Sequence, residues 1–461
     1  MDQPALGTKA EVSITGLSHD GLGVARFGSQ VVFVPGGLPG ETARIRFSVK
    51  AKRHWLAELE QLVVRSGDRQ KPPCILADHC GGCSLQHLVD PAQALWKTQK
   101  VQDAIARIAH LPLASEPILA TEQTLGYRNR AIIPLEREDS GRVRAGYYRR
   151  GSHQIVNMNR CPVLDPRIDS LIAPLKADLE ATAWPVDVDL QAEGGLRHLA
   201  LRVGANTGEV LITLVSSHAQ LEGLALLAAQ WMARWPQLVG VCLNLQPKPS
   251  NTLLGEETRV IAGRNWLLES FCGLDYRISA DTFFQVNTAQ AERVVPLVLQ
   301  ALASMPTGAL VDAYCGIGTY TLPLAAKGWT VHGIELSAEA VKQAKVNAEI
   351  NNLTGRATFE AGVVSRCLPE HLIHCDGLLL DPPRKGLDRF VVEAILLRPP
   401  QTLIYLSCDP ATLARDLALL TAEAYQLESL QPIDFFPQTT HVETLAVLRR
   451  QSLKAGSSSS V

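Results

Sequence analysis

Three side chains suited to covalent or acid–base chemistry lie near the end of the sequence. Asp381 opens the run Asp-Pro-Pro-Arg, Cys408 lies in Ser-Cys-Asp-Pro, and Glu443 lies in His-Val-Glu-Thr. Asp381 follows a short apolar run at residues 376–380. Cys408 follows another at 402–407, and both runs are typical of buried strands. Two carboxylates and a thiol can together supply a nucleophile, a base and a group that holds a substrate.

The surroundings of Cys408 favour a reactive thiol. It stands at the end of a predicted strand, and the next two residues lead into a predicted helix over 411–420. A helix N-terminus lowers the pKa of a nearby thiol and favours the thiolate nucleophile. Glu443, just before a predicted final strand at 445–449, is a candidate general base. The alternatives are a small buried thiol at Cys408 and an ordinary surface carboxylate at Glu443.

A glycine-containing turn between residues 310 and 319 is suited to binding a nucleotide-like group. It passes from a predicted strand into a helix, and Gly316 and Gly318 let the backbone approach a ligand. The next predicted strand ends in Glu335, 17 residues after Gly318, where a carboxylate can accept hydrogen bonds from ribose hydroxyls. Enzymes that bind NAD usually have a third small residue where this sequence has Leu322. The pattern is closer to that for S-adenosylmethionine (SAM).

Strands and helices alternate regularly from residue 309 onward, which indicates an open, mostly parallel sheet. Ligands bind outside the carboxyl ends of such strands. We therefore expect four residues to line one crevice: Gly316, Glu335, Asp381 and Cys408.

Four cysteines form a candidate metal site. Cys74, Cys80 and Cys83 have the spacing C-x5-C-x2-C, and Cys161 is followed by proline. The two glycines after Cys80 let the loop approach a ligand closely. Four thiolates can hold a [4Fe–4S] cluster or a tetrahedral zinc ion. A single C-x2-C pair is unlike most zinc ribbons and favours the cluster, while unligated thiols are the third alternative.

Residues 8–64 alternate apolar and polar side chains between glycine turns, which predicts a small β-barrel. Five basic residues on its last strands form either a solvated face or an RNA contact: Arg44, Arg46, Lys50, Lys52 and Arg53. The net charge of the whole chain is −2, but residues 1–160 have a net charge of +6 and the remainder −8. Chance imbalance aside, this distribution fits a part that binds a polyanion joined to a catalytic part.

The composition of the 461 residues, 46% hydrophobic and 20% charged, is that of a globular protein of several domains. It excludes a fully disordered chain, a collagen-like fibre and a disulfide miniprotein. No apolar run reaches roughly 18 residues, and the first residues lack the features of a signal peptide. We therefore expect a cytoplasmic protein whose ten cysteines are thiols or metal ligands. The Ser-rich end, residues 453–461, is expected to be disordered.

Together these motifs resemble those of the RNA (uracil-5-)methyltransferases, and most of all the TRAM-containing iron–sulfur enzymes that methylate 23S rRNA. The resemblance covers roughly residues 8–450. It rests on the four cysteines, on Phe-Phe-Gln-Val-Asn at 283–287, and on the turn from Asp312 to Gly318. The three blocks around Asp381, Cys408 and Glu443, in that order, make it specific.

The resemblance implies an α/β multidomain protein. Residues 1–66 would form an RNA-binding TRAM barrel (OB-like), residues 67–280 a central α/β region with the iron–sulfur site, and residues 281–452 a Rossmann-like class I SAM methyltransferase domain. Cys408 would be the nucleophile and Glu443 the base. The residues implied to bind SAM are Gln285, Tyr314, Gly316, Gly318, Glu335 and Asp381, the last also near the uracil. The implied ligands of a structural or RNA-orienting [4Fe–4S] cluster are Cys74, Cys80, Cys83 and Cys161.

The implied partner is RNA, with 23S rRNA as the favoured substrate, and no membrane or obligate protein partner is inferred. Two residues depart from the family pattern. Val363 stands where Asp or Asn commonly meets adenine, which puts one adenine contact in doubt. Asp409 stands where asparagine is common, and its charge would raise the pKa of the Cys408 thiol unless the side chain points away.

Other functions remain open. The same chemistry acts on tRNA uridine in relatives of this architecture. An amino-methyltransferase would use Asp-Pro-Pro near an exocyclic amine and would need no thiol. A non-catalytic RNA-binding or assembly factor would keep only a vestigial pocket. A radical-SAM enzyme would need a C-x3-C-x2-C loop, which this sequence lacks.

Overall fold

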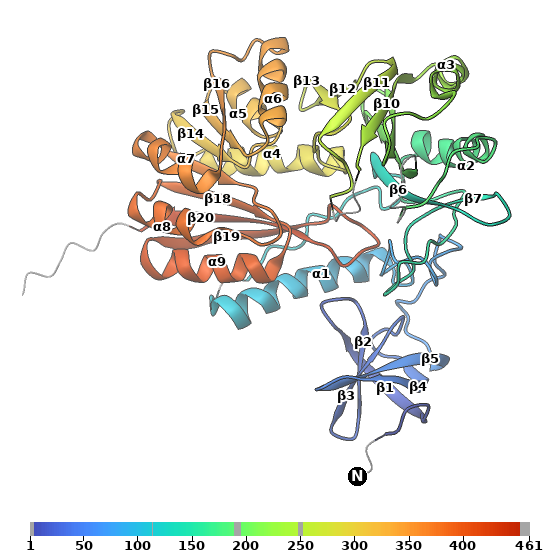
Figure 1. Ribbon diagram of the computed structural model, residues 1–461. Helices are drawn as coiled ribbons and strands as arrows, with labels where there is room; N and C mark the ends of the chain where they lie inside the picture. The colour runs from blue at the N-terminus through green and yellow to red at the C-terminus, as the bar shows by residue number, and fades with distance from the viewer. Residues whose placement is uncertain (1–3, 113, 189–194, 248–251, 452–461) are drawn as a thin grey trace, which may run out of the picture.

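The computed structural model describes residues 4–112, 114–188, 195–247 and 252–451 (Figure 1). The end of the chain that we expect to be disordered, residues 453–461, lies outside these ranges. The described residues form a small barrel, a six-stranded sheet, a two-stranded hairpin and a seven-stranded sheet. None of the helices they form is long and apolar enough to cross a membrane.

The N-terminal barrel is closed, with strand order β1-β2-β3-β5-β4, as predicted for residues 8–64. Its strands are β1 (Lys9–Leu17), β2 (Gly23–Phe27), β3 (Gln30–Val34), β4 (Thr42–Lys50) and β5 (His54–Val64). Alternate side chains point inward, and Phe47 and Trp55 meet edge to face in a core of its own. The barrel therefore needs little from the rest of the chain to bury its apolar surface.

A long connection links the barrel to the body of the protein. It contains the cysteine-rich loop and then helix α1 (Asp90–Ala104), which continues as a π-helical turn, η1 (Ile105–Ala109). In Figure 1, α1 lies between the barrel and α9, and Val101 and Ile105 are buried in the core that α9 also covers.

The middle of the chain forms a mixed sheet with strand order β11-β10-β9-β8-β6-β7. Its strands are β6 (Arg130–Arg137), β7 (Val143–Ala145), β8 (Leu196–Val203), β9 (Val210–Ser216), β10 (Leu238–Leu245) and β11 (Glu257–Gly263). Every residue of β8 and β9 is buried, because both faces are covered. Helices α2 (Pro166–Glu180) and α3 (Leu224–Arg234) pack on one face. On the other, Leu211 and Cys242 join the core of the C-terminal part.

The C-terminal part is a seven-stranded sheet with strand order β16-β15-β14-β17-β18-β20-β19. The strands are β14 (Ala309–Ala313), β15 (Thr330–Glu335), β16 (Ala357–Ala361), β17 (Gly377–Leu380), β18 (Thr402–Ser407), β19 (Tyr425–Ile433) and β20 (Glu443–Arg450). The first five in this order run parallel, and β20 is antiparallel to both its neighbours. The alternation from residue 309 thus gives the predicted open, mostly parallel sheet.

Helices cover both faces of this sheet. One face is covered by α4 (Thr288–Leu302), α5 (Thr321–Ala326) and α6 (Ala338–Ile350). The other is covered by α7 (Val364–His371), its 3-10 extension η2 (Leu372–His374), α8 (Arg389–Leu397) and α9 (Pro410–Glu423). The hairpin of β12 (Trp266–Phe271) and β13 (Leu274–Ser279) packs beside α6 and joins the core on the α4 side.

Candidate functional site

The topology brings the predicted residues to one edge of the seven-stranded sheet. Glu335 ends β15, Tyr314 follows β14, Asp381 follows β17 and Cys408 follows β18. Because these four neighbouring strands run parallel, their carboxyl ends lie side by side. Gln285 reaches the same place from the segment before α4, and its Nε2 lies 3.4 Å from an Asp381 carboxylate oxygen.

The antiparallel strand β20 adds Glu443 to this edge. Ser407, the last residue of β18, pairs with Thr444, the second residue of β20. The next step along the two strands therefore places Cys408 beside Glu443. Glu443 is the first residue of the strand, which begins two residues earlier than the predicted 445–449. A sheet position fixes this carboxylate more firmly than a surface loop would.

The carboxyl groups of the site are buried close to one another. The pKa of Glu443 is raised to about 8, mainly by burial and also by the neighbouring Asp381, while Arg384 opposes the shift. Burial also raises the pKa of Asp381 to about 7, with a contribution from Asp312. Two adjacent buried carboxyls resist being ionised together, so they titrate as a coupled pair near neutral pH.

The expected lowering of the Cys408 pKa is wrong for the protein without substrates. Burial raises the pKa of this half-buried thiol to about 12, and the charges of Glu443 and Asp381 add to the shift. Asp409 does not face the thiol, because its carboxylate accepts a hydrogen bond from the Thr412 N–H (2.8 Å) as the cap of α9.

The glycine turn is shaped by contacts that exclude larger residues. Tyr314 and Gly316 both have positive φ (71° and 56°), and the Gly316 N–H donates to Glu335 Oε2 (3.1 Å). At Gly318, also at positive φ, a Cβ would lie 3.2 Å from the Phe359 ring. The Tyr314 ring is partly buried against the core under α8 and α9, and burial raises its pKa to about 12. The turn offers mainly backbone to a ligand.

The departure at Val363 has a structural consequence. Val363 is the residue before α7, its side chain is 45% exposed, and its carbonyl accepts the N–H groups of Arg366 and Cys367. The preceding Gly362 N–H donates to the Glu335 carbonyl (2.9 Å). An isopropyl group here cannot hydrogen-bond to adenine, so a contact at this position is apolar or made by the backbone.

Helix α1 holds the loop that leads into Glu443. The buried Lys97 Nζ donates to Asp434 Oδ1 (2.6 Å) and to the Phe436 carbonyl (3.0 Å). Gln93 exchanges two hydrogen bonds of 3.0 Å with Gln438, one from its side-chain amide and one to its side-chain oxygen. Lys100 donates to the Thr440 carbonyl (2.8 Å). The sequence analysis gave none of these three residues of α1 a role, because their burial and their partners are visible only in the structure.

The cysteine loop reaches the same segment. The N–H groups of Ser84 and Leu85, directly after Cys83, both donate to the Gln438 carbonyl. Gln438 has a positive φ of 69°, so these contacts support a backbone conformation that is otherwise unfavourable. The loop and the crevice are therefore joined through one residue.

The four predicted ligand cysteines lie close together and are free thiols. Burial raises the pKa of Cys83 to about 12 and that of Cys161 to about 11, and the neighbouring thiols raise both further. Yet no three of the four sulfur atoms, all within the described ranges, lie within 4.8 Å of one another. The backbone around them is ordered: the Gly82 N–H donates to Cys80 Sγ (3.4 Å), and Gly81 packs against the Tyr148 carbonyl.

Positive charge gathers at the mouth of the crevice. Burial lowers the pKa of His441 to about 4, and the charges of Arg384, Lys100, Lys97 and Arg128 add to this. The barrel also reaches this point, since a Cβ on Gly21 would lie 2.7 Å from Thr440. Arg384 was part of a quoted motif, but the sequence assigned it no role.

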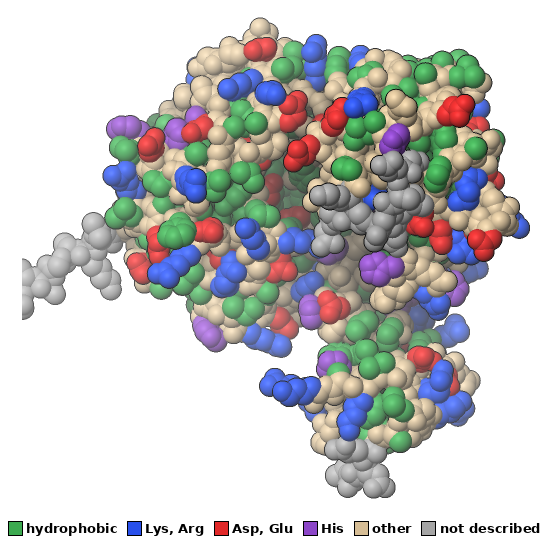
Figure 2. Space-filling view, viewed as in Figure 1, with side chains coloured by type: hydrophobic (Ala, Val, Ile, Leu, Met, Phe, Trp, Pro, Cys, Tyr) green, Lys and Arg blue, Asp and Glu red, His purple; other side chains and the backbone are tan. Residues whose placement is uncertain are grey.

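The basic residues of the barrel are less available than the sequence implied. Arg44 and Arg46 pair with acidic residues of the neighbouring strands, namely Glu11, Glu58 and Glu60. Figure 2 shows Lys and Arg intermixed with Asp and Glu on the right edge of the barrel. Lys52 and Arg53, in the exposed turn between β4 and β5, are the better candidates for RNA contact.

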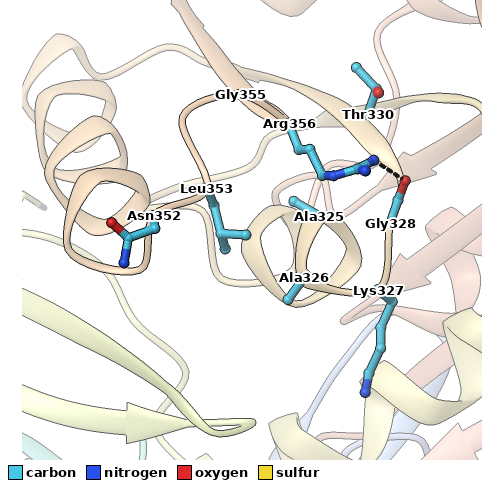
Figure 3. A pocket seen from close by; sticks show the side chains of 9 residues that line it. All are labelled: Ala325, Ala326, Lys327, Gly328, Thr330, Asn352, Leu353, Gly355 and Arg356. Carbon is cyan, nitrogen blue, oxygen red and sulfur yellow. Dashed lines mark hydrogen bonds between the residues drawn. The ribbon is translucent and has the colours of Figure 1, made fainter.

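A separate pocket lies at the other end of the sheet (Figure 3). It is lined by residues around the start of β15 and the turn before β16, and Arg356 donates to the Gly328 carbonyl (2.7 Å) across it. None of the predicted catalytic or SAM-binding residues lines it. Because it lies at the amino ends of the strands, it is not the crevice described above.

Comparisons with known proteins agree with this geometry. A family model described as "tRNA (Uracil-5-)-methyltransferase" matches residues 255–358 and 370–451, and a TRAM domain model matches residues 5–49. An uncharacterized RNA methyltransferase of Parasynechococcus marenigrum is 50% identical over 97% of each chain. Another, of Listeria innocua, is 34% identical over 95% of this chain and 97% of its own.

One solved structure resembles the whole fold. It is the crystal structure of the Pyrococcus abyssi tRNA (uracil-54, C5)-methyltransferase in complex with S-adenosyl-L-homocysteine. The likeness has a TM-score of 0.76 at 27% identity and covers 95% of this chain and 100% of that one. The barrel, the middle sheet and the C-terminal sheet therefore occur together in a protein of known structure.

Proposed function

This chain belongs to the RNA (uracil-5-)methyltransferase family and uses SAM as its methyl donor, and we propose that it methylates C5 of a specific uridine in 23S rRNA to give 5-methyluridine. The observation that carries the proposal is the pairing of β18 with β20, which sets Cys408 beside Glu443. Uracil C5 is a weak nucleophile. The reaction therefore needs one group that adds to C6 and another that removes the C5 proton, and these two residues have the right chemistry.

The proposed reaction has three steps. The Cys408 thiolate forms a bond to uracil C6, which leaves a nucleophilic enolate at C5. C5 then attacks the methyl carbon of SAM, and the bond from that carbon to the sulfonium breaks to give S-adenosylhomocysteine. Finally, Glu443 takes the C5 proton, the C6–sulfur bond breaks, and the thiolate is restored. Holding the reacting groups in line can supply on the order of 7–11 kcal/mol of the barrier reduction in favourable cases.

The raised pKa values tell when the thiolate forms. Burial beside two carboxyl groups raises the pKa of Cys408 to about 12. A sulfonium cation in the same crevice lowers the pKa of each neighbouring acid by charge attraction. We infer that SAM binding favours the thiolate and the ionised Glu443 together, so that the nucleophile is generated only when the methyl donor is present.

The SAM pocket is proposed to use both backbone and side chains. Glu335, at the end of β15, would accept hydrogen bonds from the ribose hydroxyls, while Gly316 and Gly318 let the backbone approach. Tyr314 belongs to the same turn. Gln285 and Asp381, 3.4 Å apart, would hold the amino-acid end of SAM, and Asp381 would also lie near the uracil.

The four-cysteine site is proposed to hold a [4Fe–4S] cluster through Cys74, Cys80, Cys83 and Cys161. The thiols of Cys74, Cys80 and Cys161 lie near enough to Cys83 to raise its pKa, so the four sulfur atoms converge on one place. Each of four such thiolates can bind a different iron of a cluster. When bound, the cluster would cross-link the loop to the segment at Cys161. Its role is then structural or RNA-orienting.

RNA contact is proposed for residues 1–66 and 67–280, and catalysis for 281–452. The barrel touches the crevice mouth at Thr440, so one RNA can contact Lys52 or Arg53 and still place a base in the crevice. A base in structured RNA must first be unstacked, which costs a few kcal/mol. Phosphate contacts to the basic residues around His441 would offset this cost.

Methylation of a tRNA uridine is the second candidate. It is favoured by the likeness to the Pyrococcus abyssi enzyme, which acts on tRNA uracil 54 and covers 95% of this chain. The deciding experiment is transfer of labelled methyl from SAM to unmodified 23S rRNA and tRNA transcripts by anaerobically purified protein. Label as 5-methyluridine in rRNA supports the proposal. Label in tRNA alone replaces the substrate but keeps the chemistry, and label in neither refutes both.

A further inference from the structure

A second group of possible metal ligands lies away from the crevice, at the edge of the C-terminal sheet. His332 on β15 pairs in register with Thr358 on β16, and Glu360 lies two residues further along the same face. Helix α7 packs over this face and contributes Cys367 and His371, which are four residues apart and therefore on one side of the helix. Three separate elements thus converge on one point.

The donor atoms are close enough for one ion. His371 Nε2 lies 2.9 Å from Glu360 Oε2, and His332 Nε2 lies 3.6 Å from the same oxygen. The two imidazole rings are stacked with centroids 3.8 Å apart. One ligand atom each from His332, Glu360 and His371 all lie within 4.8 Å of one another. The Cys367 thiol also hydrogen-bonds to Glu360.

An ion pair between His371 and Glu360 does not account for the whole group. His332 Nε2 is buried, and Glu360 Oε2 at 3.6 Å is beyond hydrogen-bond distance, while its Nδ1 shares a hydrogen bond with Thr358 Oγ1 (2.8 Å). A buried polar atom without a partner costs stability and calls for an explanation. The bond from Thr358 resembles the outer contact that orients a metal-binding histidine and leaves the other nitrogen free to coordinate.

We propose that His332, Glu360 and His371 bind one zinc-type divalent cation, and that Cys367, whose sulfur lies outside their 4.8 Å group, turns toward the ion as the fourth ligand. Two imidazoles, a carboxylate and a thiolate are the ligands that such an ion takes in a tetrahedral site. Small rotations of the stacked rings bring both Nε2 atoms to the ion. The ion would tie α7 to β15 and β16.

The site is distinct from the crevice and from the four-cysteine loop. Its ligands lie on β15, which ends at Glu335, and on β16, which is followed by Gly362. A bound ion would therefore stiffen that part of the SAM pocket. An ion that binds only the folded state raises the melting temperature, and the rise is larger when the ion binds more tightly. The site is therefore detectable without measuring methyl transfer.

The test uses tag-free, full-length protein purified anaerobically and treated with a mild chelator. Co²⁺ is titrated by visible absorption, and Zn²⁺ is titrated by calorimetry and by thermal melting. The variants Glu360→Gln and His371→Asn remove ligands, Cys367→Ser removes only the sulfur, and His374→Asn is the matched control three residues beyond His371. Circular dichroism and SAM binding verify that each variant is folded.

The wild type and His374→Asn should each bind one Co²⁺ per chain at this site and melt higher with Zn²⁺. Glu360→Gln and His371→Asn should bind that ion at least tenfold more weakly and lose the thermal shift. Cys367→Ser should keep an ion but lose the absorption from a single sulfur–cobalt bond. Equal ion binding and thermal shifts in all folded proteins, or no binding by the wild type, would overturn the proposal.

Discussion

Cys408 and Cys83 are two half-buried thiols with the same raised pKa, about 12, and the same main cause, burial. Their neighbours differ. Cys408 stands beside Glu443, Asp381 and Arg384, whereas Cys83 stands beside three other thiols. Burial alone therefore does not distinguish a nucleophile from a metal ligand. The neighbours do, because they decide which cation can stabilise the thiolate: a sulfonium in one case and iron in the other.

The two regions also differ in how the backbone presents the thiol. Cys408 follows a central strand, and the pairing of β18 with β20 fixes its distance from Glu443. Cys83 lies in an irregular loop that is held by hydrogen bonds rather than by a sheet: the Gly82 N–H donates to Cys80 Sγ, and the Cys74 N–H donates to the side-chain oxygen of Gln86. A sheet edge keeps its geometry without a ligand. An irregular loop of thiols depends on the ligand for much of its order.

The largest effect should come from replacing the nucleophile. Cys408→Ala should lower methyl transfer by at least about 10³-fold, because no other thiol is placed to add to uracil C6. SAM affinity and iron content should stay unchanged, since Cys408 is proposed to contact neither. Cys272→Ser, at an exposed cysteine outside the crevice, is the control. Full methylation by Cys408→Ala, measured with labelled SAM, would remove Cys408 as the nucleophile.

Cys83→Ser should have the opposite profile. Iron and acid-labile sulfide should fall, and the melting temperature should drop, because the loop loses a ligand. Turnover should fall less than in Cys408→Ala, because the cysteine loop affects Glu443 only through the position of residues 434–441. If this variant kept its iron and sulfide, the comparison of the two thiols would lose its basis.

Replacing the base should separate the steps of the reaction. Glu443→Gln keeps the shape of the side chain but cannot take the C5 proton, so the enzyme should stop after methyl transfer. We expect turnover to fall by about 10²–10⁴-fold and a covalent protein–RNA adduct to accumulate on denaturing gels. The double variant with Cys408→Ala should form none. Normal turnover without an adduct would refute the role of Glu443.

The same variant tests the raised pKa through stability. The pKa of Glu443 is about 8 in the folded protein and near 4.5 when unfolded, so the folded state holds the extra proton between these values. Wild-type stability contributed by this group is therefore full below about pH 4.5 and is lost as the pH rises through 8. The glutamine in Glu443→Gln does not titrate. The free energy of unfolding of this variant, relative to that of the wild type, should therefore rise by a few kcal/mol between pH 5 and pH 8.5. The free energies of unfolding of both proteins are measured with urea at pH 5 and pH 8.5. The same difference between variant and wild type at the two pH values would contradict this prediction.

The methyl donor should change the reactivity of one cysteine in particular. SAM and S-adenosylhomocysteine have nearly the same shape, but only SAM carries a sulfonium charge. Alkylation of Cys408 by iodoacetamide, followed by peptide mass spectrometry, should be about tenfold faster with SAM, which corresponds to about one pKa unit. The four loop cysteines should react equally with both. Equal rates at Cys408 would mean that the thiolate is generated by the RNA instead.

The sequence predicted much of this arrangement, because parallel strands place their carboxyl ends together whatever their length. Asp381 and Cys408 each follow an apolar run, and the two strands that these runs form are neighbours in the sheet. What it did not predict is how charges buried near one another interact. The pKa of Cys408 was expected to fall, and it rises, mainly because the thiol is buried and further because Glu443 and Asp381 are brought beside it from β20 and β17. The effect of these carboxyl groups depends on their distance in space from the thiol, which the spacing of residues along the sequence does not give.

Contacts between distant segments were also beyond the sequence. Lys97 and Gln93 looked like ordinary polar residues of a helix, yet both are buried against a loop more than 300 positions later in the chain. A buried lysine charge needs an opposite charge beside it, and nothing in the sequence marks Asp434 as the partner of Lys97. The pairing of Arg44 and Arg46 with barrel glutamates was hidden for the same reason.

The smallest effect should come from the residue that joins the two regions. The buried side chain of Gln93 donates to the Leu85 and Leu88 carbonyls beside the cysteine loop and exchanges hydrogen bonds with Gln438. Gln93→Ala leaves those groups unpaired, so the loop before Glu443 should shift and kcat should fall about three- to tenfold, corresponding to about 1 kcal/mol. KM for SAM should not change, because Gln93 is remote from the glycine turn. Gln99→Ala, exposed on the same helix, is the control.

Gln93→Glu then distinguishes positioning from simple loss of stability. It keeps the oxygen that accepts the Gln438 N–H and loses the amide that donates to Gln438 Oε1. If Gln93 acts by holding Gln438, the glutamate variant should recover part of kcat, and the cluster should remain in both variants. If kcat falls only in step with melting temperature, or if iron is lost as in Cys83→Ser, the residue supports the fold in general. The two thiol regions would then be neighbours without being coupled.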